Sequence, residues 1–473
     1  MISNEYFSRN LLKIIGLLCL PRRILVGVSG GVDSICLAFL LSEYRKRYQP
    51  ELEITAVTID HSYRHESNRE AISVGEQVKK WGLNHIIRKL EYDKPVHSIS
   101  NFEEVARQKR FEEFRSVSKE IKSKFIFVGH NQDDQIETYL QRLQQGSTLF
   151  GLRGLQLFTP LPMPAEDPAD VNIFLVRPLL GFSKEEIRSN CCERGIEWFE
   201  DKTNNDIFLT KRNRLRFLVK EVSTGMLSSN SLILLKLNLI KTHNEVVRYT
   251  DKVDQHAKEL YKTIENSLTF NKGNGSLVLN IPIRFMTHEM DLILSRLLYW
   301  LLYPISSIKH YHWAYAKIER QMVPKLIRLK EGNENRIKLV CLNLTIVAAV
   351  NHKTGNIMLT CFRQPLLKED NFRNSLSITS SLTWGHWILF DRRFWLRFRL
   401  PFQFCLRIVP FTKNIHTSLL NEVCDIKERH IEGEYLEGVP LVFKENSLVS
   451  VPTYDLFIEK NIEVEWCLKQ HRL

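Results

Sequence analysis

An apolar segment that runs directly into a glycine-rich turn is the feature that most constrains how this 473-residue chain folds. Residues 24–28 form a short, β-branched run typical of a strand buried on both faces of a parallel sheet. The six residues that follow are Ser29, Gly30, Gly31, Val32, Asp33 and Ser34. Their two glycines permit a sharp turn in which backbone N–H groups approach a ligand closely. An apolar-periodic segment then begins at Ser34 and indicates a helix, so the pattern predicts an anion-binding cradle.

The residues of this turn leave two interpretations open. The turn is not a Walker A loop, because that pattern ends in Lys followed by Ser or Thr and neither pair is present here. It is either a cradle for nucleotide phosphates or a tight strand-to-helix turn that happens to be rich in glycine.

Strand-like and helix-like segments alternate through the first 195 residues. The apolar runs are at 24–28, 54–59, 86–90, 125–128 and 174–176, and the helical patterns are at 34–44, 68–81, 102–119, 133–144 and 183–195. This alternation predicts an α/β fold, a doubly wound, Rossmann-like parallel sheet. Ligands of such sheets bind at the carboxyl ends of the strands, where Asp60 and His61 follow the second run and His130 follows the fourth.

The character of the sequence changes after residue 217. Helical patterns cover 229–265 and 284–330, whereas later segments alternate in the manner of strands, with a hairpin at 387–400. We therefore expect three domains: 1–217 with the parallel sheet, a helical middle domain at 218–335, and a smaller mixed or β-rich module at 336–473.

Charge and cysteine content narrow the function classes. The net charge of +12 favours a polyanionic partner. None of the nine cysteines falls in a C-x-x-C pair, so no zinc ribbon or C-x-x-C-held cluster is indicated. The longest apolar candidates are far shorter than the roughly 20 residues that a bilayer span needs, so we expect no membrane span. The first 23 residues, with one acid against four bases, suit either an organelle-targeting segment or an ordinary first helix at 6–19.

A second polar group follows the fourth predicted strand. Asp133 and Glu137 lie one helical turn apart, with His130 before them and Asp134 between them. Carboxylates beside a phosphate cradle repel a nucleotide unless a cation separates them, and Mg²⁺ bound by carboxylates and phosphates fills that role. The alternative for any single residue is a charged helix start.

Together these motifs resemble the tRNA(Ile)-lysidine synthetase family of PP-loop ATP pyrophosphatases. The resemblance spans residues 24 to about 217 and rests on several motifs in the family's order. They lie at 29–34, 60–64, 101–110, 129–138, 142–143, 151–154, 177–180, 200–204 and 212–216.

The resemblance implies an ATP-dependent carbon–nitrogen ligase. Such an enzyme adenylates the wobble cytidine of a CAU-anticodon tRNA(Ile) at C2, and free L-lysine then displaces AMP to give lysidine, which changes decoding from AUG to AUA. ATP and Mg²⁺ are the implied cofactors, with no membrane partner. The oligomeric state is left open, with a dimer as one option. The expected catalytic residues are Asp33, Asp133, Arg107 and His130. The expected nucleotide-binding residues are Ser29, Gly30, Gly31, Val32, Asp33, Ser34, Asp60 and His61. The expected substrate and tRNA contacts are Arg110, Glu137, Arg212, Asn213 and Arg216, and the expected metal ligands are Asp33, Asp133 and Asp134.

Two further functions stay open: tRNA 2-thiolation by a related PP-loop enzyme, which usually needs paired cysteines, and RNA binding without catalysis. A mitochondrial location is preferred because the N-terminus is basic and poor in acids, with a bacterial cytoplasm or a plastid as alternatives. Five arginines near the C-terminus alternate with aromatic residues and suit either a tRNA surface or an amphipathic strand pair. They are Arg392, Arg393, Arg397, Arg399 and Arg407.

Overall fold

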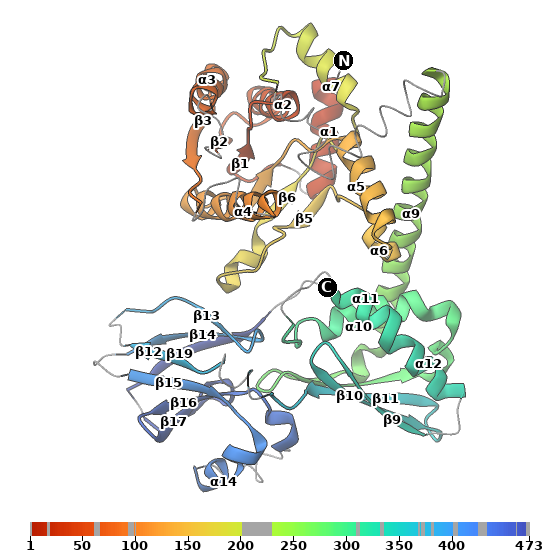
Figure 1. Cartoon of the computed structure of the whole chain (residues 1–473), viewed down its shortest axis with the longest axis vertical. Helices are drawn as coiled ribbons and strands as arrows, with labels where there is room; N and C mark the ends of the chain where they lie inside the picture. The colour runs from red at the N-terminus through yellow and green to blue at the C-terminus, as the bar shows by residue number, and fades with distance from the viewer. Residues whose placement is uncertain are drawn as a thin grey trace. The chain divides into compact units, whose positions relative to one another are not determined.

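The chain forms two compact units in this computed structural model (Figure 1). The structure describes residues 2–16, 19–60, 67–92, 99, 101–200, 229–308, 313–331, 335–367, 369, 374–379, 383–400, 405–423, 433–459 and 461–469. Unit 1 comprises Met1–Pro164 and Ala169–Thr250, and unit 2 comprises Ala165–Pro168 and Asp251–Leu473. The first boundary therefore lies near residue 250, later than the predicted 217, and helix α9 (Ser229–Ile264) runs through it.

Unit 1 is built on a six-stranded sheet in the order β3-β2-β1-β4-β6-β5. Every pairing in it is parallel except that of β5 with β6. The strands are β1 (Arg23–Gly27), β2 (Glu53–Asp60), β3 (Asn84–Lys89), β4 (Phe125–Phe127), β5 (Phe158–Pro160) and β6 (Phe174–Val176). The predicted doubly wound α/β fold is confirmed. Edge strand β5 was not predicted, because three residues ending in proline carry too little periodicity to indicate a strand.

Helices cover both faces of this sheet, as the buried character of β1 requires. On one face Ile24 and Val26 pack with Ile35 of α2, and on the other Leu25 packs with Phe114 of α4. Figure 1 shows α2 and α3 on one side of the sheet and α4 on the other. The helices are α1 (Asn4–Ile15), α2 (Val32–Tyr48), α3 (Ser67–Lys80), α4 (Phe102–Glu120), α5 (Gln132–Gln144), α6 (Leu149–Leu152), η2 (Pro168–Asn172) and α7 (Lys184–Glu193).

Helix α1 is formed by the basic N-terminal segment. It begins after the N-cap Ser3, whose side chain accepts a hydrogen bond from Tyr6 N–H, and ends at the left-handed Gly16. Phe7 and Leu11 are buried in the same core cluster as Ile24. The predicted first helix is confirmed, with the bounds Asn4–Ile15 in place of 6–19, and a targeting role of the same segment stays a prediction.

The first part of unit 2 is an antiparallel sheet covered by helices. Its five strands have the order β7-β8-β11-β10-β9, and it crosses the predicted boundary at residue 335 because β8 pairs with β11. The strands are β7 (Thr269–Asn271), β8 (Ser276–Pro282), β9 (Arg336–Cys341), β10 (Leu344–Asn351) and β11 (Asn356–Arg363). The helical segments are η4 (Glu265–Ser267), η5 (Ile283–Phe285), η6 (His288–Met290), α10 (Asp291–Leu302), α11 (Ala314–Lys317), the π-helix η8 (Ile318–Met322) and α12 (Val323–Glu331). The middle segment is therefore mixed, not helical alone.

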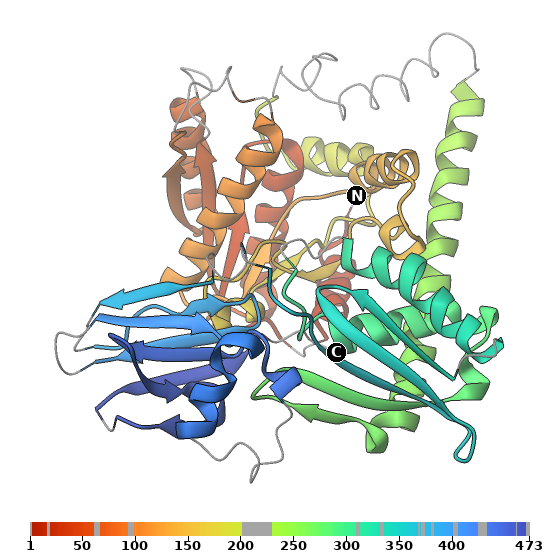
Figure 2. The ribbon, with the colours of Figure 1, turned by 60° about the horizontal axis from the view of Figure 1, so that its bottom comes forward.

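Two further antiparallel sheets form the C-terminal part of unit 2 (Figure 2). One has the order β12-β15-β16-β17-β18 and the other the order β13-β14-β19. Their elements are β12 (Leu376–Thr379), β13 (Ile388–Phe390), β14 (Phe394–Arg399), β15 (Cys405–Pro410), α14 (Lys413–Val423), η9 (Gly433–Leu436), β16 (Pro440–Lys444), β17 (Ser447–Val451), η10 (Pro452–Tyr454), β18 (Leu456–Phe457) and β19 (Glu463–Leu468). The predicted hairpin at 387–400 is present as β13 and β14.

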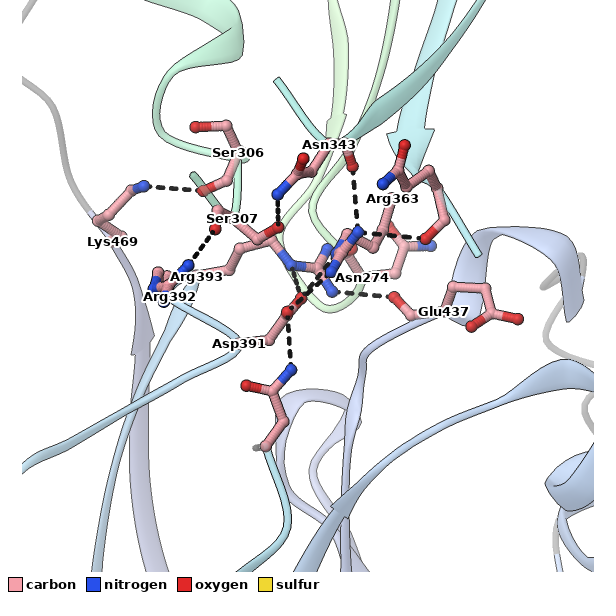
Figure 3. Close-up of polar contacts among 12 residues, drawn as sticks. Asn274, Ser306, Ser307, Asn343, Arg363, Asp391, Arg392, Arg393, Glu437 and Lys469 are labelled. Atoms are coloured by element: carbon pink, nitrogen blue, oxygen red, sulfur yellow. Dashed lines mark hydrogen bonds and ion pairs between the residues drawn. The ribbon is translucent and has the colours of Figure 1, made fainter. Parts of the chain in front are cut away.

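A buried ionic network joins the middle sheet to the β13–β14 hairpin inside unit 2 (Figure 3). The carboxylate of Asp391 accepts hydrogen bonds from Arg363 Nε at 3.1 Å and from Arg393 Nε at 2.7 Å. These three side chains are at most 2% exposed. Arg393 also donates to the carbonyls of Asn274 and Glu437, at 3.0 and 2.9 Å. A single carboxylate is therefore the shared counter-ion of two guanidinium groups that lie away from water.

The turn that carries this network is held in an uncommon backbone conformation. Asp391 and Arg392 have φ values of +42° and +52°, and Arg393 N–H donates to Phe390 C=O at 3.0 Å. Two consecutive left-handed residues are the signature of a type I′ turn, which normally selects Asn or Gly. The ionic contacts of Asp391 give the physical reason why this turn forms without glycine.

Candidate active site

The glycine turn predicted from the sequence joins β1 to α2 in unit 1. Gly30 has φ +89°, a left-handed conformation that favours glycine, and Gly31 occupies the N-cap of α2 without a capping side chain. Ser34 Oγ accepts from Ser29 N–H at 3.1 Å and donates to Gly31 C=O at 3.0 Å. These bonds hold the turn closed, so the first N–H groups of α2, including that of Val32, are placed to receive an anion.

The loop after β4 lies directly against this turn. A Cβ atom on Gly129 would come within 2.9 Å of both the Asp33 carbonyl carbon and the Ser34 backbone nitrogen. Only glycine permits so close an approach of two backbones. Strands β1 and β4 are neighbours, while β2 lies on the other side of β1, so the two loops meet where the strand order reverses. This is the position at which doubly wound sheets bind their ligands.

Asn131 connects the two loops through its side chain. Its Nδ2 donates to Asp33 Oδ1 at 2.9 Å, while its Oδ1 accepts from Asp134 N–H at 3.1 Å. The Asp134 carboxylate accepts from Asn131 N–H in return, so the two residues form a capping box at the start of α5. Burial raises the pKa of Asp33, although the bond from Asn131 opposes that effect. No role was predicted for Asn131, but an Asn-x-x-Asp spacing before a helix is a signal that would have found it.

Asp133 is bound on both carboxylate oxygens. Lys236 Nζ, from α9, lies 2.7 Å from Oδ1, and the backbone N–H of Lys184 donates to Oδ2 at 2.8 Å. Burial favours the neutral acid, but the contacts with Lys236 and Lys184 outweigh it and lower the pKa of Asp133. The sequence carried no signal for either lysine, because both contacts join segments far apart along the chain.

The described residues include no group of three or more His, Cys, Asp or Glu side chains able to hold a metal ion. Asp33 and Asp134 both bond to Asn131, and Asp133 bonds to Lys236 and Lys184. Magnesium binding by Asp33, Asp133 and Asp134 therefore stays a prediction.

Three arginines of unit 1 lie near one another. Burial, followed by the positive charges of Arg107 and Arg142, lowers the pKa of Arg177 to about 10. Arg107 and Arg110 both lie over the ring of Phe111 on α4, at 5.2 and 5.8 Å. Arg177 is buried and donates to Gln156 C=O at 2.7 Å, so part of this positive charge serves the fold. Positive charge gathered in this way also favours a polyanionic ligand nearby.

The remaining predicted site residues are placed as follows. Asp60, at the end of β2, is buried and accepts from Ser67 Oγ at 2.7 Å. His130 and Glu137 are half-buried, before and within α5. Four predicted residues lie outside the described residues: His61, Arg212, Asn213 and Arg216.

The prediction of a basic tRNA surface near the C-terminus is wrong for part of its residues. Arg393 is fully buried in the ionic network, and Phe394, Trp395 and Phe398 are buried in the core. Arg397 and Arg399 are paired with Glu465 and Glu463 across β14 and β19. The amphipathic strand pair, which was the alternative interpretation, describes this hairpin because alternate side chains of β14 face opposite sides.

The family match and the named relatives of this sequence agree with a nucleotide-binding turn between β1 and α2. The PP-loop domain family matches residues 4–222. A probable tRNA(Ile)-lysidine synthase of Schizosaccharomyces pombe is 25% identical over 468 residues, which cover 96% of this chain and 95% of that protein. The tRNA(Ile)-lysidine synthase of Brucella ovis is 32% identical over 204 residues, 43% of each chain. Among solved structures, the U34-tRNA thiolase NcsA of Methanococcus maripaludis with its 4Fe-4S cluster has 18% identity and a TM-score of 0.39, over 52% of this chain and 80% of that one.

Residues 4–222 are therefore similar to a PP-loop domain in sequence, and this segment contains the glycine turn between β1 and α2. The resemblance to the tRNA(Ile)-lysidine synthetase family is confirmed by relatives that carry this name, one of them over nearly the whole chain. The predicted class, an ATP-dependent ligase, is confirmed with it. Among the described helices, none combines the length and apolar character that crossing a bilayer requires.

Proposed function

We propose that this protein converts the wobble cytidine of a CAU-anticodon tRNA(Ile) to lysidine, using ATP and free L-lysine. The observation that carries the proposal is the meeting of the glycine turn and the Asp33, Asn131 and Asp133 group at the reversal of the strand order. The full-length likeness to the S. pombe relative supports it.

In the first step the cytosine C2 oxygen attacks the α-phosphorus of ATP. The bond between the α-phosphorus and the bridging oxygen breaks, and pyrophosphate leaves with the electron pair. The N–H groups of Gly30, Gly31 and Val32 would bind the leaving pyrophosphate, aided by the Ser29 and Ser34 hydroxyls. Mg²⁺ bound with the triphosphate would supply further charge neutralisation.

In the second step the neutral amine of lysine attacks the adenylated C2, and AMP leaves. The amine loses a proton in this step, and we assign its acceptance to a carboxylate of the site or to His130. The ammonium of Lys236 lies on Asp133, so this carboxylate is suited to bind an amino group of the substrate in place of Lys236. Arg107, near Arg142 and Arg177, would neutralise phosphate charge.

We further propose a mitochondrial location, since the N-terminal segment is basic and poor in acids. Expression of the tagged full chain with a mitochondrial marker tests this directly. A uniformly cytosolic signal would contradict it.

The activity is tested by incubating the full chain with ATP, Mg²⁺, radiolabelled lysine and a CAU-anticodon tRNA(Ile). We expect lysine-dependent labelling of the RNA, lost in Asp33→Ala and retained in Glu76→Ala, which removes an exposed carboxylate from α3. Incorporation of sulfur in place of lysine would favour the 2-thiolation alternative. RNA binding without ATP turnover would favour the non-catalytic one.

A further inference from the structure

A pocket in the C-terminal part of unit 2 lies between α14 and the sheet that contains β15 and β16. Its cavity of about 490 Å³ is in the range of small-molecule sites. On its sheet side, Arg407 of β15 and Phe443 of β16 are directly opposite each other, and the guanidinium lies 5.8 Å from the ring centre. On its helix side the lining includes His416 and Glu422.

Arg407 differs from the other arginines of this region in its charge partners. Arg393, Arg397 and Arg399 each form an ion pair with an aspartate or glutamate. Within the described part of the chain, Arg407 has no carboxylate within ion-pair distance, and its side chain is exposed. The guanidinium N–H groups of Arg407 are therefore available to a ligand, and their planar arrangement suits two phosphate oxygens.

His416 supplies a second donor to the same pocket. The backbone N–H of Thr412 donates to His416 Nδ1 at 3.0 Å, so this ring nitrogen acts as an acceptor. Burial lowers the pKa of His416 and the charge of Arg407 adds to that effect, whereas the hydrogen bond to the Thr412 backbone opposes it; the net lowering favours the neutral ring. The ring proton is then on Nε2, which is left as a hydrogen-bond donor. Ser375, Thr412 and Ser418 also line the cavity.

We propose that this pocket binds the phosphate of a ribonucleotide, with Arg407 and His416 as the phosphate donors. Glu422 is then suited to accept a hydrogen bond from a ribose hydroxyl, which a simple phosphate ion lacks. Apolar lining from Val409, Leu419 and Phe443 gives the base a surface to pack on. The ribonucleotide is either free or part of an RNA chain, since both carry the same phosphate and ribose. The proposal does not depend on lysidine formation by unit 1.

The test is hydrogen–deuterium exchange of the full chain, with excess AMP or with tRNA as the probe. We expect one of the two to slow exchange in peptides covering 405–410 and 413–423. Arg407→Ala is expected to weaken this protection roughly tenfold or more, the usual loss for a charged hydrogen-bonding group, and Arg407→Lys by less. Arg399→Ala is the matched control, since it removes the same charge from an arginine that is already paired with Glu463.

The outcomes distinguish a free ribonucleotide from RNA as the ligand of the pocket. They also distinguish failure of this inference from failure of the proposed lysidine formation. Protection by AMP identifies a free ribonucleotide, and protection by tRNA alone identifies a nucleotide within RNA. Protection by neither, or protection that Arg407→Ala leaves unchanged in a protein that melts like the wild type, overturns the inference. Exchange in peptides covering residues 24–34 reports nucleotide binding by unit 1 separately, so failure of one site is distinguishable from failure of the other.

Discussion

The ionic network around Asp391 makes a strong prediction about stability. The Asp391→Asn variant keeps the shape of the side chain and its tolerance of a left-handed backbone, but it removes the negative charge. Asp391 accepts bonds from Arg363 Nε at 3.1 Å and Nη2 at 3.2 Å, from Arg393 Nε at 2.7 Å and from Asn374 Nδ2 at 3.2 Å. The variant therefore leaves two buried guanidinium groups without their shared counter-ion.

The expected loss is large because both cations lie away from water. Removing one partner of a buried ion pair costs about 3–5 kcal/mol of unfolding free energy. For a unit of this size, roughly 2–4 °C is lost per kcal/mol, so the melting temperature of unit 2 should fall by about 6–20 °C. Thermal and urea unfolding of the full chain, followed by proteolysis to identify the unit that unfolds, measure this change.

Two further variants make the experiment decisive. Glu463→Gln breaks the exposed pair with Arg399 and should change stability little, because water solvates both groups. Adding Arg393→Met to Asp391→Asn should restore part of the loss, since an apolar side chain needs no counter-ion. The reasoning is refuted if Asp391→Asn destabilises no more than Glu463→Gln does.

Three predictions concern unit 1. Gly129→Ala should abolish ATP turnover while leaving secondary structure by circular dichroism intact, since its Cβ would come within 2.9 Å of the Asp33 and Ser34 backbone; full turnover would contradict this. Lys236→Ala should lower the KM for lysine in the labelling assay, because it frees Asp133 of a competing ammonium, and an unchanged KM would count against that role. Asp33→Asn should be inactive yet more stable to urea at neutral pH. Burial raises the folded-state pKa of Asp33, so the carboxylate destabilises the fold above that pKa, and the gain should vanish below the unfolded value of about 4. An equal gain at both pH values would refute this reasoning.

The sequence predicted most elements of unit 1 closely because they carried their own local patterns, which the short edge strand β5 did not. The run at 174–176 corresponds to β6 without a shift, and α5 begins at Gln132, one residue before the predicted start. In unit 2 the strand patterns were also local, but the pairing of the strands with one another was not. Strand β8 joins β11 across about eighty residues, and no periodicity within β8 indicates that partner.

The difference between local patterns and long-range contacts also applies to the functional residues. Two glycines in a turn after an apolar strand were enough to predict the phosphate cradle, since the need for a left-handed residue is a local property of the backbone. Only the tertiary structure showed that Lys236 lies on Asp133 and that Arg393 is buried with Asp391, whereas Arg407 is exposed. A residue type and its spacing determine what a side chain can bind. Which charge it meets depends on segments brought together by folding, and these contacts decide whether a cation stabilises the core or remains available to a ligand.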